Sequence, residues 1–294
     1  MFYLLASIVL NTILFVLFKF YSRFGIDNLQ AIVANYWTCV VTGCLVLGDF
    51  PVSVASVDES WLPWALLMGS MFFSVFNLIA YCTVKEGITT TTVANKLSLV
   101  IPVIFAPFLY GETLGAIKIA GILVAFPAVY LTTKVEDHGR KTQELLWPIL
   151  IFVGSGLLDT MVKYVQAFHV KSDAELVSFT IHTFVVAGTA GLITVIVQLL
   201  RGKIRLHWKN LLAGIVLGIP NYFSIYCLLH FLKSGIMHSS AAIPVNNIGI
   251  VLLSALIAIL FFSEKVTKLR VVGLILSILA ILLIALGDLN GTGV

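Results

Sequence analysis

Two stretches of this sequence resemble each other across the middle of the chain. Residues 110–133 read YGETLGAIKIAGILVAFPAVYLTT, and residues 262–285 read FSEKVTKLRVVGLILSILAILLIA. In each, a short polar segment ends in a glutamate, and a glycine follows nine residues later. These repeat markers are Glu112 and Gly121 in the first stretch and Glu264 and Gly273 in the second. The shared spacing predicts that the chain contains two related halves.

Further matches extend the repeat toward the N-terminus of each half. Residues 84–88 read VKEGI and residues 232–236 read LKSGI, while Asn11-Thr12 corresponds to Asp159-Thr160. The offset is 148 residues for the early matches and 152 for the later ones, which indicates about four residues inserted between them. Apolar stretches can look alike through composition alone, but here the spacing and the glycine-containing turns both repeat.

The composition is that of an integral membrane protein. Hydrophobic residues make up 60% of the 294 residues and charged residues only 11%, whereas a soluble domain has about 25% charged residues. The net charge of +4 is modest, and the basic residues lie in short inter-helix segments. Nucleic acid is therefore not an expected partner, and the lipid bilayer is.

Apolar segments of the length needed to cross a bilayer, about 20 residues, recur along the whole chain. The expected spans are 2–20, 28–48, 61–83, 88–110, 114–133, 145–167, 175–200, 208–232, 238–262 and 266–287. We therefore expect an all-α integral membrane protein with two five-helix repeats, residues 1–137 and 138–294. Because five is odd, the second repeat enters the membrane inverted, as in many secondary transporters, whose substrate site lies near mid-membrane between the repeats.

The basic residues predict the orientation. If both termini lie on the non-cytoplasmic side, most of the 18 Lys and Arg residues fall in cytoplasmic segments, as the positive-inside rule requires. The segment 49–60, GDFPVSVASVDE, is acidic without a basic residue, as an outer loop can be. We expect a protein of the cell (inner) membrane with both termini outside the cytoplasm.

Ten spans in two repeats, each closing with a GE or SE turn before a glycine-bearing helix, resemble the EamA-like family of the drug/metabolite transporter (DMT) superfamily. The resemblance covers nearly the whole chain and implies an alternating-access carrier of small metabolites, amino acids or drugs. The VANK segment at 93–96 is similar to a motif of some nucleotide-sugar carriers. It lies in the fourth span, however, and its counterpart at 244–248 reads PVNNI, so we infer no nucleotide sugar.

Lys96 is the most informative polar residue within a span, because ionisable groups there are costly and usually face a cavity or a partner. Thr89 and Thr92 share its helical face, and Pro102 frees a backbone carbonyl nearby. We favour Lys96 as a cavity residue that binds an anionic group. The alternative is that its ammonium extends to the membrane interface.

Asp159 and Lys163 stand four residues apart in the sixth span and share a helical face. Two interpretations are open: a structural ion pair, or a proton-coupling carboxylate released from Lys163 during transport. His182 is the deepest of the titratable histidines.

Other polar residues at depth are asparagines, and two groups of them follow Pro220 and Pro244. Polar groups beside a helix break are where transporters bind ligands. The predicted substrate-binding residues are Thr92, Asn95, Lys96, Tyr36, His182, Asn221, Tyr222, Asn246 and Asn247.

Several other residues have expected structural roles. Glu112 and Glu264 are expected to accept hydrogen bonds from the N-terminus of the following helix. The motif GIVLG at 214–218 predicts close helix packing within the bundle, or else a dimer face. Trp61, Trp64, Trp147 and Trp208 lie near span starts, where tryptophan anchors a helix at the membrane interface.

The sequence lacks the motifs of hydrolases, metalloenzymes and phosphate loops. We expect no enzyme, metal or cofactor, and a monomer or homodimer. The predicted function is secondary-active transport of a small metabolite, an amino acid or other carboxylate or anion, with a proton as the candidate coupling ion. The alternative is an exporter of hydrophobic or cationic compounds through an aromatic-lined cavity.

Overall fold

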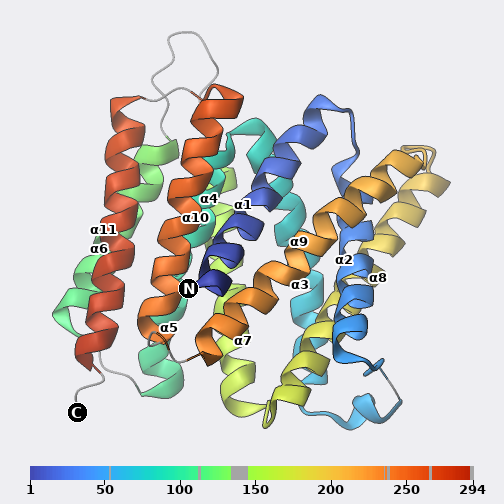
Figure 1. Cartoon of the computed structure of the whole chain (residues 1–294), viewed down its shortest axis with the longest axis horizontal. Coiled ribbons are helices and arrows are strands. Elements are labelled where there is room, and N and C mark those ends of the chain that lie inside the picture. The colour runs from blue at the N-terminus through green and yellow to red at the C-terminus, as the bar shows by residue number, and fades with distance from the viewer. Residues whose placement is uncertain are drawn as a thin grey trace. The chain divides into compact units, whose positions relative to one another are not determined.

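The structure is a computed structural model that describes residues 1–52, 54–111, 114–133, 145–234, 236, 239–264 and 267–291. These residues are almost entirely helical, and no β-strand occurs among them. Figure 1 shows the helices, which are α1 (Phe2–Arg23), α2 (Asn28–Leu47), the short 3-10 helix η1 (Val54–Asp58), α3 (Leu62–Lys85), α4 (Ile88–Leu97), α5 (Val100–Tyr110), α6 (Ala116–Thr133), α7 (Leu146–Phe168), α8 (Asp173–Leu200), α9 (Trp208–Lys233), α10 (Ser239–Phe262) and α11 (Lys268–Gly291).

The described residues contain ten segments long and apolar enough to cross a membrane. Nine of them each lie within one helix, and the tenth, Ile88–Tyr110, comprises α4 and α5. Their positions agree with the ten spans expected from the sequence, and the ends differ by a few residues. The expectation of an all-α protein with ten apolar helical spans is confirmed at this level.

The fourth span is distorted in its middle, where Ser98 and Leu99 keep right-handed helical backbone angles between α4 and α5. Helix α4 ends at Leu97 and α5 begins at Val100. Pro102 has no N–H, so it cannot bond to the carbonyl of Ser98. The Ile101 N–H donates to that carbonyl instead, at 2.9 Å, and the Ser98 hydroxyl donates to the carbonyl of Asn95. Helix α4 therefore ends at Leu97, about one turn before Pro102.

The chain divides into two compact units. Unit 1 comprises Met1–Lys19, Cys82–Leu157 and Ser224–Val294, and unit 2 comprises Phe20–Tyr81 and Leu158–Phe223. Helices α4, α5, α6, α10 and α11 belong wholly to unit 1, and α2 and α8 wholly to unit 2. The remaining long helices contribute one segment to each unit, so neither unit is one half of the sequence.

In unit 1, α6 and α11 are in close antiparallel contact through glycines. A Cβ atom on Gly121 would lie 2.8 Å from Cγ1 of Ile284, and one on Gly273 would lie 2.7 Å from Cγ2 of Thr132. The early part of each helix thus meets the late part of the other. Beside this pair, α10 packs against α11 and α4, as Figure 1 shows for α10 and α11.

Unit 2 contains a similar antiparallel pair, α2 and α8. A Cβ atom on Gly43 would lie 3.3 Å from Cγ1 of Ile181, and one on Gly191 would lie 2.6 Å from Cγ2 of Val33. The G-x-x-x-G motif on α9 packs against α2, where a Cβ atom on Gly218 would lie 2.8 Å from the carbonyl oxygen of Asn35. The motif thus makes the packing contact within the bundle that its sequence predicts.

We expect Gly121→Ala and Gly273→Ala each to lower the free energy of unfolding by about 1–3 kcal/mol, because the added methyl group overpacks the α6–α11 contact. Thermal unfolding in detergent measures the effect. Gly115→Ala is the matched control, since a Cβ atom at Gly115 would meet nothing within 4 Å. Equal stability of all three variants would contradict the close contact.

Candidate functional site

In unit 1, several of the predicted site residues lie at the C-terminal end of α4. The Asn95 side-chain amide donates to the hydroxyl of Ser155 on α7 at 2.9 Å. Lys96 is half-buried and lies in the last turn of α4. A cation there is stabilised by the partial negative charge of the helix C-terminus. The helix break therefore gives Lys96 a favourable electrostatic position that the sequence did not indicate.

The consecutive threonines of α4 are all buried, and the hydroxyl hydrogens of Thr90, Thr91 and Thr92 already have acceptors. Thr92 donates to the carbonyl of Ile88 at 2.8 Å, and Thr91 donates to that of Gly87. Thr90 donates across to the carbonyl of Thr132 on α6 at 3.1 Å. Thr92 can therefore offer a ligand only its remaining acceptor capacity.

Helix α10, which packs against α4, contributes two more predicted residues to unit 1. Asn246 is buried, and its Oδ1 has no hydrogen-bond partner among the described residues; Asn247 is half-buried. Pro244 lies inside α10 and lacks the N–H that would bond to the carbonyl four residues earlier. The structure thus places these polar residues on two helices, α4 and α10, that pack against each other.

Glu264 differs from its expected role. Its carboxylate accepts hydrogen bonds from the N–H groups of Ile88, at 2.6 Å, and Thr89, at 3.4 Å, at the N-terminus of α4. The following helix, α11, is capped instead by Thr267, whose hydroxyl accepts from the N–H of Arg270. Glu264 therefore joins the α10–α11 connection to the start of a helix in the other half of the sequence. Its repeat counterpart, Glu112, lies outside the described residues.

The residue before α4 must be a glycine for this contact. Gly87 has φ +105°, a conformation that side chains disfavour, and a Cβ atom on it would lie 2.7 Å from Oε1 of Glu264. Arg270 lies 3.8 Å from the same carboxylate, and both side chains are nearly buried. In the first half, the repeated K-x-G-I pattern therefore lies at the start of α4, where backbone N–H groups donate to the carboxylate of Glu264.

In unit 2, two of the predicted residues make specific polar contacts. The Tyr36 hydroxyl donates to the carbonyl of Phe72 at 2.9 Å, and its ring lies near those of Phe76 and Phe184, at 5.8 and 6.1 Å between centroids. The Asn221 side-chain amide donates to Oδ1 of Asn35 at 3.1 Å.

Asn35, which sequence reasoning did not select as a site residue, is fully buried. Its Nδ2 has no hydrogen-bond partner within the described part of the chain. Tyr222, another predicted residue, is half-buried and packs against Gly43. Tyr36, Asn221 and Tyr222 thus belong to the packed interior of unit 2.

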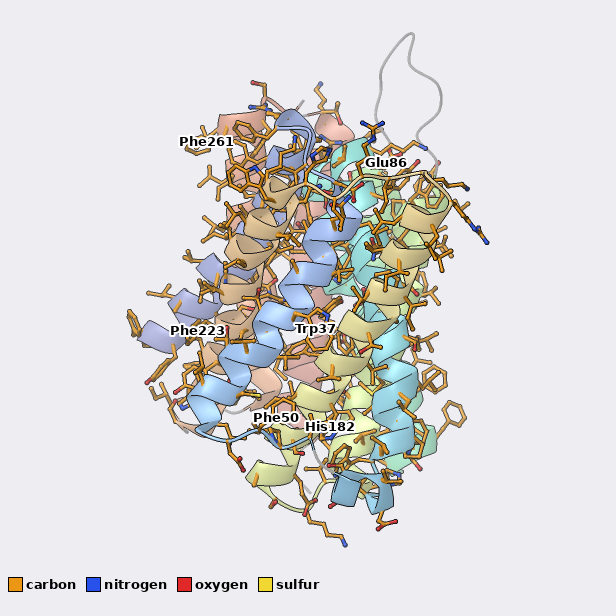
Figure 2. The ribbon with its side chains drawn as sticks, turned by 90° about the vertical axis from the view of Figure 1, so that its right-hand side faces the viewer. Trp37, Phe50, Glu86, His182, Phe223 and Phe261 are labelled. Carbon is orange, nitrogen blue, oxygen red and sulfur yellow. The ribbon has the colours of Figure 1, made fainter. Side chains whose placement is uncertain are left out.

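His182 is buried on α8, and its Nδ1 lies 2.8 Å from the carbonyl oxygen of Ser178. Its ring packs edge-to-face on that of Trp61, with 4.9 Å between centroids. Trp61 is only 1% exposed, so it belongs to the interior of unit 2 and is not the interfacial anchor that its position near a span start suggested. Figure 2 shows His182 toward the end of unit 2 where Phe50 also lies.

Asp159 and Lys163 are both exposed on the surface of α7, one helical turn apart. They lie in the segment of α7 that belongs to unit 2, whereas Lys96 belongs to unit 1. The structure therefore places the predicted coupling residues and the predicted anion-binding residue in separate units. The coupling role stays a prediction.

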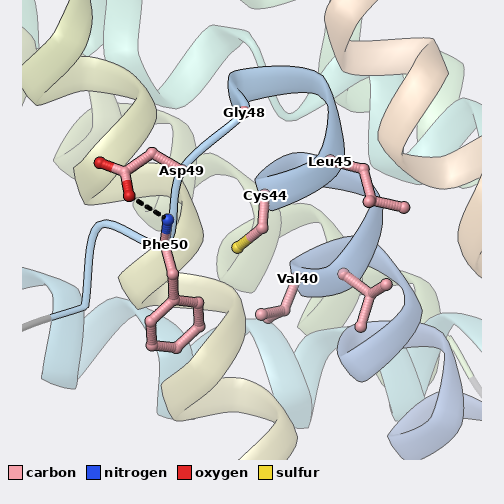
Figure 3. Close-up of a pocket in the computed structure, with 7 residues that line it drawn as sticks. Val40, Cys44, Leu45, Gly48, Asp49 and Phe50 are labelled. Carbon is pink, nitrogen blue, oxygen red and sulfur yellow. Dashed lines mark hydrogen bonds between the residues drawn. The ribbon is translucent and has the colours of Figure 1, made fainter.

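A groove of about 540 Å³ lies at the C-terminal end of α2 (Figure 3). It is formed by one continuous segment, and most of its side chains are exposed. The lining residues are Val40, Val41, Cys44, Leu45, Gly48, Asp49 and Phe50. Asp49 accepts a hydrogen bond from the N–H of Phe50, as the dashed line in Figure 3 marks. None of the predicted substrate-binding residues lines this groove.

Within the described residues, no three His, Cys, Asp or Glu side chains are grouped so that they could hold a metal ion. The four cysteines have free thiols. The polar residues described above offer hydrogen bonds and charges to a ligand.

Comparisons with known proteins identify a relative and a fold. No known family model matches the chain. An uncharacterized protein of Haemophilus influenzae is 27% identical over 289 residues, which cover 95% of each of the two chains. A protein of known crystal structure shares the fold, with a TM-score of 0.60 and 16% identity over 99% of this chain and 96% of the other. These similarities extend over nearly the whole length of the chain.

We expect Glu264→Ala to loosen the start of α4, because two helix N–H groups lose a charged acceptor and Arg270 loses its ion pair. Such bonds contribute about 1.5–3 kcal/mol each when buried. Amide hydrogen exchange of residues 88–97 measures the effect, with the N-terminus of α8, capped by Ser172, as internal control. Unchanged protection of α4 would contradict the capping role.

Proposed function

We propose that the protein is a secondary-active, alternating-access transporter of a small metabolite and a member of the EamA-like family of the DMT superfamily. Its substrate is an amino acid or another carboxylate or anion. The protein resides in the inner membrane with both termini outside the cytoplasm. The main support is a set of helix contacts that occur in pairs. In each pair, the two residues of one contact are the repeat counterparts of the two residues of the other.

The contacts between α2 and α8 are the first of these pairs. Gly43 packs on Ile181, and Val33 packs on Gly191. The interval from Gly43 to Gly191 is 148 residues, and so is the interval from Val33 to Ile181. Each contact therefore becomes the other when the two halves are exchanged.

Two more pairs of contacts follow the same rule in unit 1. Gly249 packs on Ile8, and Gly156 packs on Ile101, again with an offset of 148. On α6 and α11, Gly121 packs on Ile284 and Gly273 on Thr132, with the offset of 152 that the sequence has in this region.

If each contact turns into the other when the two halves are exchanged, the two halves are related by a two-fold axis. The paired helices α2 and α8, and α6 and α11, are antiparallel, so such an axis runs across the helices and hence in the plane of a membrane. That arrangement supports two inverted five-helix repeats, residues 1–137 and 138–294. Inverted repeats of this kind are characteristic of secondary transporters.

The polar group of unit 1 supports the substrate class. Asn95, Lys96, Asn246 and Asn247 lie on α4 and α10, which come from different repeats and pack together. Discontinuous helices whose ends approach the substrate are common at transporter sites. We propose that Lys96 binds the anionic group there, while the asparagine amides supply hydrogen bonds.

A metabolite panel tests this function through thermal stabilisation of the purified protein. We expect carboxylates or phosphates to stabilise the wild type by about 2.7 kcal/mol at about 100 times the dissociation constant. Lys96→Met should lose this effect, because the anion loses its counter-charge. Lys268→Met, which removes an exposed lysine on α11 in unit 1, is the matched control and should retain it.

The outcomes separate the two roles of Lys96. If Lys96→Met retains the full stabilisation, Lys96 does not bind the anion and only neutralises the partial negative charge at the C-terminus of α4. A panel without any stabilising compound would contradict the transporter proposal.

One observation favours the alternative, an exporter of hydrophobic or cationic compounds. Tyr36, Phe76 and Phe184 bring three aromatic rings together in unit 2, and aromatic faces attract cations. In that case cationic compounds should stabilise the wild type and Lys96→Met equally.

A further inference from the structure

We propose that Trp61 and His182 form a second site, separate from Lys96, that binds a carboxyl group together with one proton. The inference rests on the proposed function for its carboxylate substrate, and it assigns a binding site to the coupling proton. It also places the coupling at His182 and not at Asp159. The site lies entirely within unit 2.

The hydrogen-bond partner of His182 determines which of its nitrogens can bind a ligand. Nδ1 lies 2.8 Å from the carbonyl oxygen of Ser178, and a carbonyl oxygen only accepts hydrogen bonds. Nδ1 therefore has the hydrogen of the neutral ring, and Nε2 presents a lone pair. This Nε2 is buried and has no hydrogen-bond partner in the described part of the protein.

Trp61 presents a second buried polar atom beside it. Its Nε1 also lacks a hydrogen-bond partner among the residues described, and the two side chains are 1% and 5% exposed. The rings contact each other at 4.9 Å between centroids. Buried polar atoms are nearly always hydrogen-bonded, and two exceptions in adjacent rings point to a common ligand.

The two nitrogens differ in what they can bind. The indole N–H only donates, whereas Nε2 of histidine accepts when neutral and donates when protonated. A carboxyl group satisfies both, since one oxygen accepts from Trp61 and the other shares a proton with His182. The proton lies either on that oxygen or on Nε2, and the bound pair has the same net charge in both forms.

The surroundings make the proton and the carboxylate interdependent. Trp61 belongs to an apolar cluster with Ala65, Met68 and Phe179. A carboxylate without a proton would be a buried anion facing the lone pair of Nε2. A proton without the carboxylate would leave a buried imidazolium, and each lone charge is strongly disfavoured. Each species therefore raises the affinity for the other, which is the linkage that a proton-coupled carrier needs.

Other titratable groups occur on the elements that pack against α8. Within unit 2, the titratable groups on and around α2, α3 and α7 are Asp27, Tyr36, Cys39, Cys44, Asp49, Asp58, Glu59, Tyr81, Asp159, Lys163, Tyr164, His169 and Lys171. Of the charged ones, Asp27 accepts a hydrogen bond from the N–H of Gln30, and the others are exposed. Glu175 on α8 itself accepts a hydrogen bond from the N–H of Lys171. The ring in contact with His182 is that of Trp61, which has no ionisable group, so the proton that accompanies the carboxyl group is placed at the unpartnered Nε2 of His182.

Two substitutions each remove one of the two nitrogens proposed to bind the carboxyl group and leave a side chain in its place. Trp61→Phe deletes the indole N–H and retains an aromatic ring. His182→Asn keeps a donor near the position of Nδ1 for the Ser178 carbonyl and deletes Nε2. Matched controls come from a second Trp–His pair of unit 2, Trp64 and His169, whose rings lie 5.9 Å apart and are half-buried. The controls are Trp64→Phe and His169→Asn.

The experiment is calorimetric titration of the purified protein with small monocarboxylates and amino acids, each compared with its amide. Buffers of different ionisation enthalpy report the protons taken up. We expect wild type and both controls to bind carboxylates with uptake of one proton. Trp61→Phe and His182→Asn should bind roughly tenfold to a hundredfold more weakly, and His182→Asn should lose the proton uptake.

The double variant gives a further readout. If both nitrogens bind one carboxyl group, the combined loss should be smaller than the sum of the two single losses on a free-energy scale. A purely structural role would change thermal stability without changing the proton uptake.

Three results would overturn the proposal. One is carboxylate binding without proton uptake, and another is equal binding by wild type, Trp61→Phe and His182→Asn. The third is the absence of carboxylate binding. If other metabolites still stabilise the protein, or if Lys96→Met weakens carboxylate binding whereas Trp61→Phe and His182→Asn bind like the wild type, the transporter proposal survives while this site is rejected.

Discussion

The fold depends on close approach of helix backbones, and glycine is what permits it. Lipid tails are as apolar as the side chains that face them, so helices in a membrane associate through tight packing and polar contacts more than through the hydrophobic effect. Gly121 and Gly273 lie where α6 and α11 contact each other, and Gly43 and Gly191 do the same for α2 and α8. In each contact a larger residue of the opposite helix occupies the space that a side chain would need.

Polar groups add contacts between segments that are distant in sequence. Glu264 receives the first N–H groups of α4, and Gly87 leaves room for its carboxylate. Because an unsatisfied helix terminus is costly away from water, this contact relates the start of α4 to the α10–α11 connection. The break between α4 and α5 places the other end of α4, with Lys96, inside the same span. A short helix with both ends near polar groups is therefore central to unit 1.

Much of the fold could be predicted because its determinants are local. Span lengths follow from runs of apolar residues, and Pro102 indicated a freed backbone carbonyl in the fourth span, although the end of α4 at Leu97 was not predicted. A repeat was predicted because Glu264 and Gly273 stand at the same spacing as Glu112 and Gly121. The candidate site was predicted less completely. Thr92 was selected for its polar side chain, yet its hydroxyl bonds to its own helix. Asn35 was not selected, although it is buried and its amide nitrogen has no hydrogen-bond partner among the described residues.

Two residues show where sequence reasoning ends. Trp61 has the sequence position of an interfacial anchor, but it is buried because Phe179 and His182 of α8 cover its ring. Glu264 has the sequence position of a cap for α11, but its carboxylate reaches α4. The sequence by itself determined the number of apolar spans and their approximate ends, because these depend on composition along one segment. Only the tertiary structure decided which helix Glu264 caps and that the ring of Trp61 contacts His182, because those contacts join residues more than a hundred positions apart.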